Sequence, residues 1–260
     1  MFFRKSFQKL PMLVAHRGSS AATPENTLAA FGQALADGAD AIELDVHLCK
    51  DHEVVVIHDE RLERTTDGRG RVRDHSLREL KRLSAGAWFN RKFSLERIPT
   101  LGEVLDLVGG KAGVNIEIKT EHFPHRTFEI VERCLEIVHR HKASQNVLIS
   151  SFFRPYVRHA GDIDRNVARG YLYHPLRDFR ISPHALAVAA GADAIICNKN
   201  SVRKKMVNGL HENRVLVGVY TINTRASLEN MLAMNVDLVY SNKPEMIRAI
   251  LLGTKMKKGS

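Results

Sequence analysis

Short apolar runs alternate with amphipathic stretches along nearly the whole chain. The apolar runs have the length and β-branched content of buried strands. They are Met12–His16, Ala41–Val46, Gly113–Lys119, Val147–Ser151, Val167–Tyr171, Ala194–Cys197, Val215–Thr221 and Leu238–Ser241. The stretches between them predict helices, among them Thr27–Ala36, Thr127–His141, Pro183–Ala190, Val202–Asn213, Arg225–Met234 and Pro244–Leu252. This alternation is typical of a parallel α/β sheet, and eight strands with intervening helices predict a closed (β/α)8 barrel.

One further apolar run, Glu53–His58, does not fit the alternation. It follows the second strand after too few residues for a parallel crossover. We therefore predict that it folds back on that strand as an antiparallel hairpin, with the turn near Asp51 and His52. This register places His58 roughly opposite Asp45.

Residues 60–100 interrupt the pattern with a segment rich in Arg, Gly and Asp, in which only Leu77–Leu83 looks helical. The segment is too long for a simple loop, so we expect a small insertion at or near the barrel mouth. Residues 1–253 are then one domain, and the basic segment 254–260 is expected to be a disordered tail.

Polar side chains occupy the ends of three predicted strands and the end of the hairpin. They are His16 and Arg17, Glu43 and Asp45, Glu117 and Lys119, and His58. Residues two apart on a strand face the same side, and the carboxyl ends of barrel strands surround a common pocket. We therefore expect these side chains to converge.

The types of residue in this set suit the cleavage of a phosphodiester. Three carboxylates without clustered Cys or His ligands favour Mg²⁺ or Ca²⁺. Arg17 and Lys119 can hold phosphate oxygens. His16 and His58 can exchange protons near neutral pH. Each residue taken singly also has an ordinary structural interpretation, and Asn26 or Thr27 is expected only to cap the first helix. The convergence favours a metal-assisted hydrolase.

The formal net charge of +10 and the pI near 9.7 raise the question of nucleic-acid binding. The basic residues are scattered, however, and no nucleic-acid-binding motif accompanies them. We expect no nucleic-acid partner. The surplus positive charge is better suited to attracting an anionic substrate or an anionic membrane surface.

Several observations bear on where the protein works. Cys49, Cys134 and Cys197 form neither a disulfide framework nor a metal motif, which favours reduced thiols. Charges interrupt every apolar run of the first eighteen residues, so no secretory signal is expected. No apolar run reaches the roughly 18 residues that a membrane span needs. We therefore expect a cytoplasmic protein without stable membrane insertion.

The ordered set of motifs resembles the glycerophosphodiester phosphodiesterase family over nearly the full chain. The matching segments are AHRGSSAATPENTLAAF (15–31), IELDVHLCKDHEVVVIHDERLERTTDGRG (42–70), RIPTLGEVL (97–105), NIEIK (115–119), VYTIN (219–223) and DLVYSNKP (237–244). The resemblance implies a TIM-barrel fold and hydrolysis of glycerophosphodiesters to sn-glycerol 3-phosphate and an alcohol.

The resemblance also implies roles for individual residues. His16 and His58 match the general acid–base pair, in an order that the sequence leaves open. The positions that match metal ligands, for one Mg²⁺ or Ca²⁺, are Glu43, Asp45 and Glu117. Arg17 and Lys119 match phosphate-contacting positions, and the glycerol 2-hydroxyl is the implied internal nucleophile.

Two departures from the family pattern affect expectations about the substrate. The family often has Trp where this chain has Tyr220, and Asp where it has Asn242. Tyr220 still offers a flat wall for the glycerol moiety, so activity is expected, but the headgroup preference is open.

Three other questions stay open at this stage. An alternative function is lysophospholipase D-like hydrolysis at a membrane, with Trp88-Phe89 and Phe152-Phe153 in peripheral contact. A second alternative is a non-enzymatic barrel that binds nucleic acid or protein. The protein is expected to be a monomer or a homodimer.

Overall fold

The computed structural model describes residues 11–119 and 127–258, with side chains as far as Gly253. Its strands are β1 (Met12–His16), β2 (Ala41–Leu48), β3 (Val54–Val56), β4 (Gly113–Ile118), β5 (Val147–Ser151), β6 (Ala168–Tyr173), β7 (Ala194–Asn198), β8 (Leu216–Tyr220) and β9 (Leu238–Ser241). Its α-helices are α2 (Leu28–Ala36), α3 (Leu77–Leu80), α4 (Leu101–Val108), α5 (Glu129–Arg140), α6 (Arg154–Ile163), α7 (Pro175–Asp178), α8 (Pro183–Ala190), α9 (Lys204–Glu212), α10 (Arg225–Ala233) and α11 (Pro244–Lys258).

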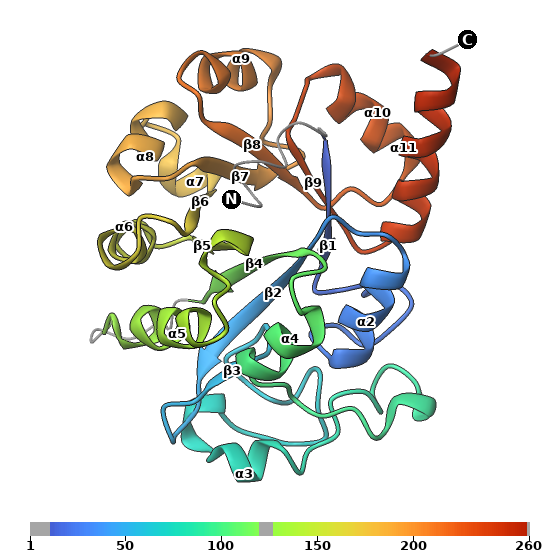
Figure 1. The fold of residues 1–260 in the computed structure, drawn as a ribbon, viewed down its shortest axis with the longest axis vertical. Helices are drawn as coiled ribbons and strands as arrows, with labels where there is room; N and C mark the ends of the chain where they lie inside the picture. The colour runs from blue at the N-terminus through green and yellow to red at the C-terminus, as the bar shows by residue number, and fades with distance from the viewer. Residues whose placement is uncertain (1–10, 120–126, 259–260) are drawn as a thin grey trace.

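The sheet closes on itself. Its strands follow the order β1-β9-β8-β7-β6-β5-β4-β2, each parallel to its neighbours, and β1 also pairs with β2. The helices surround this ring (Figure 1). The predicted (β/α)8 barrel is therefore confirmed. The strand that follows β2 is antiparallel to it, as predicted, and the Ile57 amide donates to the Asp45 carbonyl at 3.0 Å. His58 thus lies one residue beyond the position opposite Asp45.

The inside of the barrel is apolar at the amino ends of the strands. Met12 and Val14 of β1 and Ala41 of β2 belong to the interior cluster, while their strand neighbours Leu13 and Ile42 pack outward against helices. By the period of two, His16 continues the inward column of β1, and Glu43 and Asp45 continue that of β2. The same alternation that fills the core therefore aims the polar side chains into the barrel at its carboxyl end.

Local signals fix where the helices begin and end. Thr27 caps α2 by accepting from the Ala30 amide, so of the two expected caps, Thr27 fulfils the role. Thr100 and Glu103 form a reciprocal capping box at α4. That helix ends at Gly109, whose left-handed φ of 51° suits glycine.

The segment 60–100 packs beside the barrel against β2 and β3, together with the short helix α3 (Figure 1). It has a small core of its own, formed by Leu62, Val72, Leu80, Ala85 and Ile98 with Cys49, Val55 and Ile57. The helical patch expected over Leu77–Leu83 is shorter, because α3 ends at Leu80.

The last helix is longer than the sequence indicates. We expect a helix over Pro244–Leu252 and a disordered tail over 254–260, whereas α11 continues to Lys258. Residues 254–258 are helix formers apart from Thr254, and Gly253 does not adopt a positive φ, so nothing stops the helix there. Residues 259–260, like Met1–Leu10 on which the signal-sequence expectation rests, lie outside the described residues. None of the helices in the described part is long and apolar enough to span a membrane.

Candidate active site

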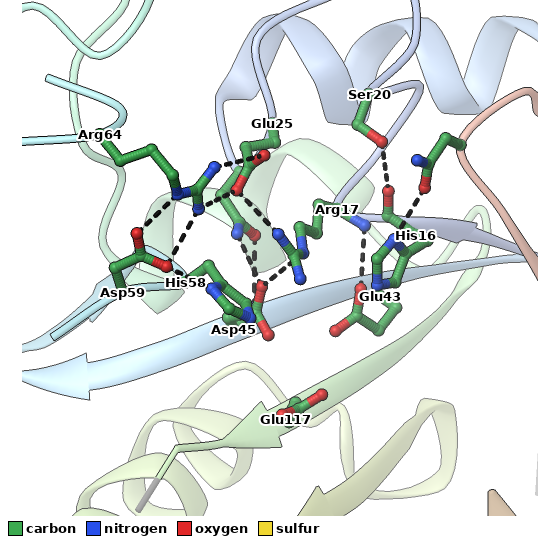
Figure 2. A network of polar contacts seen from close by, with 12 residues as sticks. His16, Arg17, Ser20, Glu25, Glu43, Asp45, His58, Asp59, Arg64 and Glu117 are labelled. Atoms are coloured by element: carbon green, nitrogen blue, oxygen red, sulfur yellow. Dashed lines mark hydrogen bonds and ion pairs between the residues drawn. The ribbon is translucent and has the colours of Figure 1, made fainter. Parts of the chain in front are cut away.

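The barrel brings the polar strand ends together. His16 of β1 is in register with Glu43 of β2, and Asp45 of β2 with Glu117 of β4. Figure 2 shows these side chains around one space, with His58 approaching from the hairpin. Lys119 follows directly after β4 and contacts the same carboxylates. Six of the residues selected from the sequence therefore lie at one end of the barrel, and Arg17, which follows His16 and pairs with Asp45, is the seventh.

Three buried carboxylates form the centre of this cluster. One oxygen from each of Glu43, Asp45 and Glu117 lies within 4.8 Å of the others. Glu43 Oε1 has no hydrogen-bond partner among the described residues. Burial and the nearby carboxylates raise the pKa of Glu43 well above its usual value, and burial raises that of Glu117. An all-oxygen set of mutually repelling groups with a free oxygen fits a hard cation.

The two basic residues at the site already have carboxylate partners. The Arg17 side chain contacts Glu25 Oε1 at 3.0 Å and Asp45 Oδ2 at 3.2 Å. Lys119 Nζ lies 2.8 Å from Asp45 Oδ1 and also pairs with Glu117. Burial opposes ionisation of Asp45, but these two cations outweigh it and hold its pKa well below the usual range. Asp45 is therefore ionised.

Asn26 binds Asp45 rather than capping the helix. Its Nδ2 donates to Asp45 Oδ2 at 2.8 Å, and its Oδ1 accepts from the Asp45 amide at 3.3 Å. The residue adopts a left-handed φ of 57°, which asparagine tolerates. Asn26 thus fixes the orientation of one carboxylate, a function that the sequence interpretation did not assign to it.

His16 is oriented by the last strand of the barrel. Its Nδ1 lies 2.8 Å from Asn242 Oδ1, an oxygen that can only accept, so Nδ1 carries the proton and Nε2 is left as an acceptor. Burial, assisted by the Arg17 charge, lowers the pKa of His16 to about 4. The imidazole is therefore neutral at pH 7.

His58 has a carboxylate partner in the next residue. Its Nδ1 lies 2.5 Å from Asp59 Oδ1. Arg64, from the insertion, donates to Asp59 Oδ2 at 2.6 Å and to Glu25 Oε1 at 2.7 Å. Although burial opposes ionisation of Asp59, the Arg64 hydrogen bond lowers the Asp59 pKa to about 2. One arginine thus connects the partner of His58 with Glu25, the partner of Arg17 (Figure 2).

His47 supports the backbone beneath His58. It follows Asp45 on the inward face of β2, and its Nε2 lies 3.1 Å from the His58 carbonyl oxygen. Burial lowers the pKa of His47 to about 4, so the neutral ring donates this hydrogen bond. The sequence interpretation assigned no role to His47, although this residue is two positions after Asp45 and therefore faces the same side of the strand.

The cluster opens into a pocket of about 440 Å³ lined by both hairpin and barrel residues. They are His47, His58, Asp59, Glu60, Arg61, Glu117, Ile118, Lys119 and Phe152. Tyr220, at the end of β8, is partly buried. Burial and the negative charge of Glu117 raise its pKa to about 12, so its hydroxyl is protonated at neutral pH.

The Arg64 contacts yield a first prediction. Arg64→Ala should lower kcat by about 10–100-fold and leave KM nearly unchanged. Without its hydrogen bonds to Arg64, Asp59 no longer holds the His58 ring in one orientation. Arg64→Lys should recover only part of the rate, since lysine lacks the bidentate fork. Steady-state kinetics check both.

Arg133 provides the matched control. The side chains of Arg64 and Arg133 are 43% and 47% exposed, and among the described residues Arg133 forms an ion pair only with Glu136, on the helix surface. Arg133→Ala should leave both constants unchanged. Equal rates for the Arg64→Ala and Arg133→Ala variants would show that the Arg64 contacts are dispensable.

A closed barrel with converging carboxylates, histidines and cations at the carboxyl ends of its strands defines a barrel enzyme that acts on an anionic ester. The sequence of the chain identifies the family to which this enzyme belongs. The chain belongs to the glycerophosphoryl diester phosphodiesterase family, whose model matches residues 16–246. It is thus a phosphodiesterase of that family.

Individual relatives agree with this assignment. A glycerophosphodiester phosphodiesterase of Caldanaerobacter subterraneus is 37% identical over 91% of this chain and 96% of its own length. One of Bacillus subtilis is 32% identical over 95% of this chain and 87% of its own length. An Oleispira antarctica phosphodiesterase, solved with the product sn-glycerol 3-phosphate, has a TM-score of 0.87 and 29% identity, covering 95% of this chain and 98% of that one.

Proposed function

We propose that this chain hydrolyses glycerophosphodiesters to sn-glycerol 3-phosphate and an alcohol, with His16 and His58 as the acid–base pair. The single observation that supports this most is the convergence of both histidines with three buried carboxylates in a chain of this family. Relatives named for this reaction cover nine-tenths of the chain.

Glu43, Asp45 and Glu117 would hold one Mg²⁺ or Ca²⁺. A bound divalent cation polarises a phosphoryl oxygen and offsets the negative charge that develops in the transition state. The unpartnered Glu43 Oε1 and the raised pKa of Glu43 and Glu117 support this assignment, because a cation would favour the ionised form of both. Lys119 and Arg17 would contribute positive charge beside the phosphate.

The surroundings of the two histidines suggest their order of action. His16 is neutral with Nε2 free to accept, so it would take the proton from the glycerol 2-hydroxyl as that oxygen attacks phosphorus. The bond from phosphorus to the leaving alcohol breaks, and His58, with Asp59 at its Nδ1, would give its proton to the departing oxygen. Water then opens the cyclic phosphate with the two roles exchanged.

Product analysis tests this proposal. Purified protein should release glycerol 3-phosphate from glycerophosphocholine, glycerophosphoethanolamine or glycerophosphoglycerol when Mg²⁺ or Ca²⁺ is present, and not in EDTA. If none of these compounds is cleaved with either cation, the proposal fails.

The His16–Asn242 contact predicts how the pH profile can be shifted. Only neutral His16 accepts a proton, so kcat/KM falls as the pH drops through its pKa. Asn242→Asp places a negative charge at Nδ1, which raises the pKa of His16 and should move the acid limb up by about 1–3 pH units. A pH series of kcat/KM measures the shift.

Asn235→Asp is the control for this substitution. It adds the same charge at an exposed position that precedes β9, at the opposite end of the barrel. Its profile should match that of the unmodified protein. An acid limb that stays in place in Asn242→Asp would mean that His16 does not set it.

A second candidate function is lysophospholipase D-like hydrolysis of lysophospholipids. Large apolar side chains exposed in the segment after β6, which includes Leu176 and Phe179, favour it. Comparing kcat/KM for lysophosphatidylcholine and glycerophosphocholine decides between the two substrates.

A further inference from the structure

The segment that follows β6 exposes large apolar side chains. Leu176 is 82% exposed, Phe179 65% and Ile181 40%. We call these three side chains, together with Arg180, the α7 surface. Single exposed apolar residues are common, but three within six positions on one short segment indicate a contact surface.

This exposure is built into the local structure. The buried carboxylate of Asp178 accepts from the Tyr171 hydroxyl at 2.9 Å, from the His174 amide at 2.9 Å and from Arg177 Nε at 3.0 Å. The polar side of the α7 segment is therefore fixed against the barrel. Leu176 and Phe179, on either side of these anchors, are left facing solvent.

The α7 surface lies beside the catalytic pocket. The α7 segment begins at the carboxyl end of β6, the same end of the barrel as His16 and Glu117. Phe152 lines the pocket, and its ring is 5.8 Å from the Arg177 guanidinium and 6.4 Å from the His174 ring. One side chain thus separates the pocket from the α7 segment.

Basic residues occupy the loops at this end of the barrel that follow β6 and its two neighbouring strands. The stretches 152–155, 174–182 and 199–205 follow β5, β6 and β7 and contain a single acidic residue, the buried Asp178. No described carboxylate forms an ion pair with their exposed basic residues Arg154, Arg180, Lys199, Arg203 and Lys205, whereas the Lys204 ammonium is turned away and donates to the Ala233 carbonyl at 3.2 Å. The Arg180 guanidinium lies 5.2 Å above the Phe179 ring.

We propose that the α7 surface docks this enzyme on a bilayer that contains anionic lipids. Three apolar side chains are too few for a stable protein interface, which needs about 800 Å² per partner. They are enough to enter the headgroup region when nearby lysines and arginines attract anionic lipids. The inference does not depend on which phosphodiester is cleaved.

Vesicle co-sedimentation tests the docking without any turnover. The 260-residue chain should bind vesicles of phosphatidylcholine mixed with phosphatidylglycerol, bind pure phosphatidylcholine vesicles much less, and lose binding as salt is added. Phe179→Ser should weaken binding by about tenfold or more, since it removes a large apolar group from the interface.

Leu176 and Leu95 form a matched pair, because each is 82% exposed and Leu95 lies in the insertion. Leu176→Ser should weaken binding, whereas Leu95→Ser should not. Circular dichroism and thermal melting show that each variant is folded, and the rate on soluble glycerophosphodiesters should be unchanged.

Three results would overturn the proposal. One is absence of binding to the anionic vesicles, and another is an equal effect of Leu176→Ser and Leu95→Ser. The third is a dimer that Phe179→Ser dissociates while vesicle binding stays the same, which would identify the α7 surface as a contact between two copies. Failure of the hydrolysis assay alone would leave the docking result intact.

Discussion

Replacing His16 by alanine should reduce kcat by about 10²–10⁴-fold, the usual contribution of a positioned acid–base group. KM should change little, because His16 Nδ1 is engaged by Asn242 and only Nε2 faces the reaction. The variant should also lose the acid limb of its pH profile, since the group that titrates there is gone. Steady-state release of glycerol 3-phosphate over a pH series measures both effects.

The control for this variant is His139→Ala. His139 lies in the last turn of α5, where its side chain is 46% exposed and pairs with Asp164. Its loss should leave kcat unchanged. A decrease of less than tenfold in the His16→Ala variant would contradict a role for His16 in proton transfer.

Replacing Glu43 by glutamine should affect activity and stability in opposite directions. Activity should fall by about 10²-fold or more, because a cation ligand with its charge is lost. In EDTA at pH 7, the free energy of unfolding should rise by roughly 0.5–2 kcal/mol. The pKa of Glu43 is raised, which means that the folded state resists ionisation of this carboxyl. Glu43 therefore destabilises the folded state increasingly as the pH rises above the pKa that the carboxyl has in the unfolded chain.

Thermal melts with and without metal check this prediction. The unmodified protein should gain stability when Mg²⁺ or Ca²⁺ is added, and Glu43→Gln should gain much less. Glu136→Gln, which removes a charge from an exposed ion pair on α5, should behave like the unmodified protein in both conditions. If Glu43→Gln is less stable in EDTA and still responds fully to metal, Glu43 is not a ligand.

The barrel and its hairpin could be predicted because their signals are local in the chain. The run before His58 is too close to the second strand for anything but an antiparallel return, and the structure has this pairing. The inward direction of Glu43 and Asp45 follows from their spacing alone. Strand ends that face one pocket were therefore predictable without any contact information.

The groups that orient these side chains could not be found in this way. Arg64 is one of several arginines in an irregular segment, where no periodicity shows which one faces Asp59. Asn26 looks like a helix cap, because caps and carboxylate partners use the same residue types. The exposure of Leu176 and Phe179 depends on the contacts that Asp178 makes with Tyr171 and His174, and an irregular segment has no periodicity from which such contacts can be predicted.

The contact between His16 and Asn242 joins residues 226 positions apart. The three buried carboxylates and both histidines come from the first 117 residues, so a growing polypeptide carries them long before Asn242 is made. Without β9 beside β1, the His16 ring has no partner to fix its tautomer. Under the proposed mechanism, catalytic competence is therefore acquired late in synthesis, only after the ring of strands has closed. The chemical shifts of the His16 imidazole would report that closure directly.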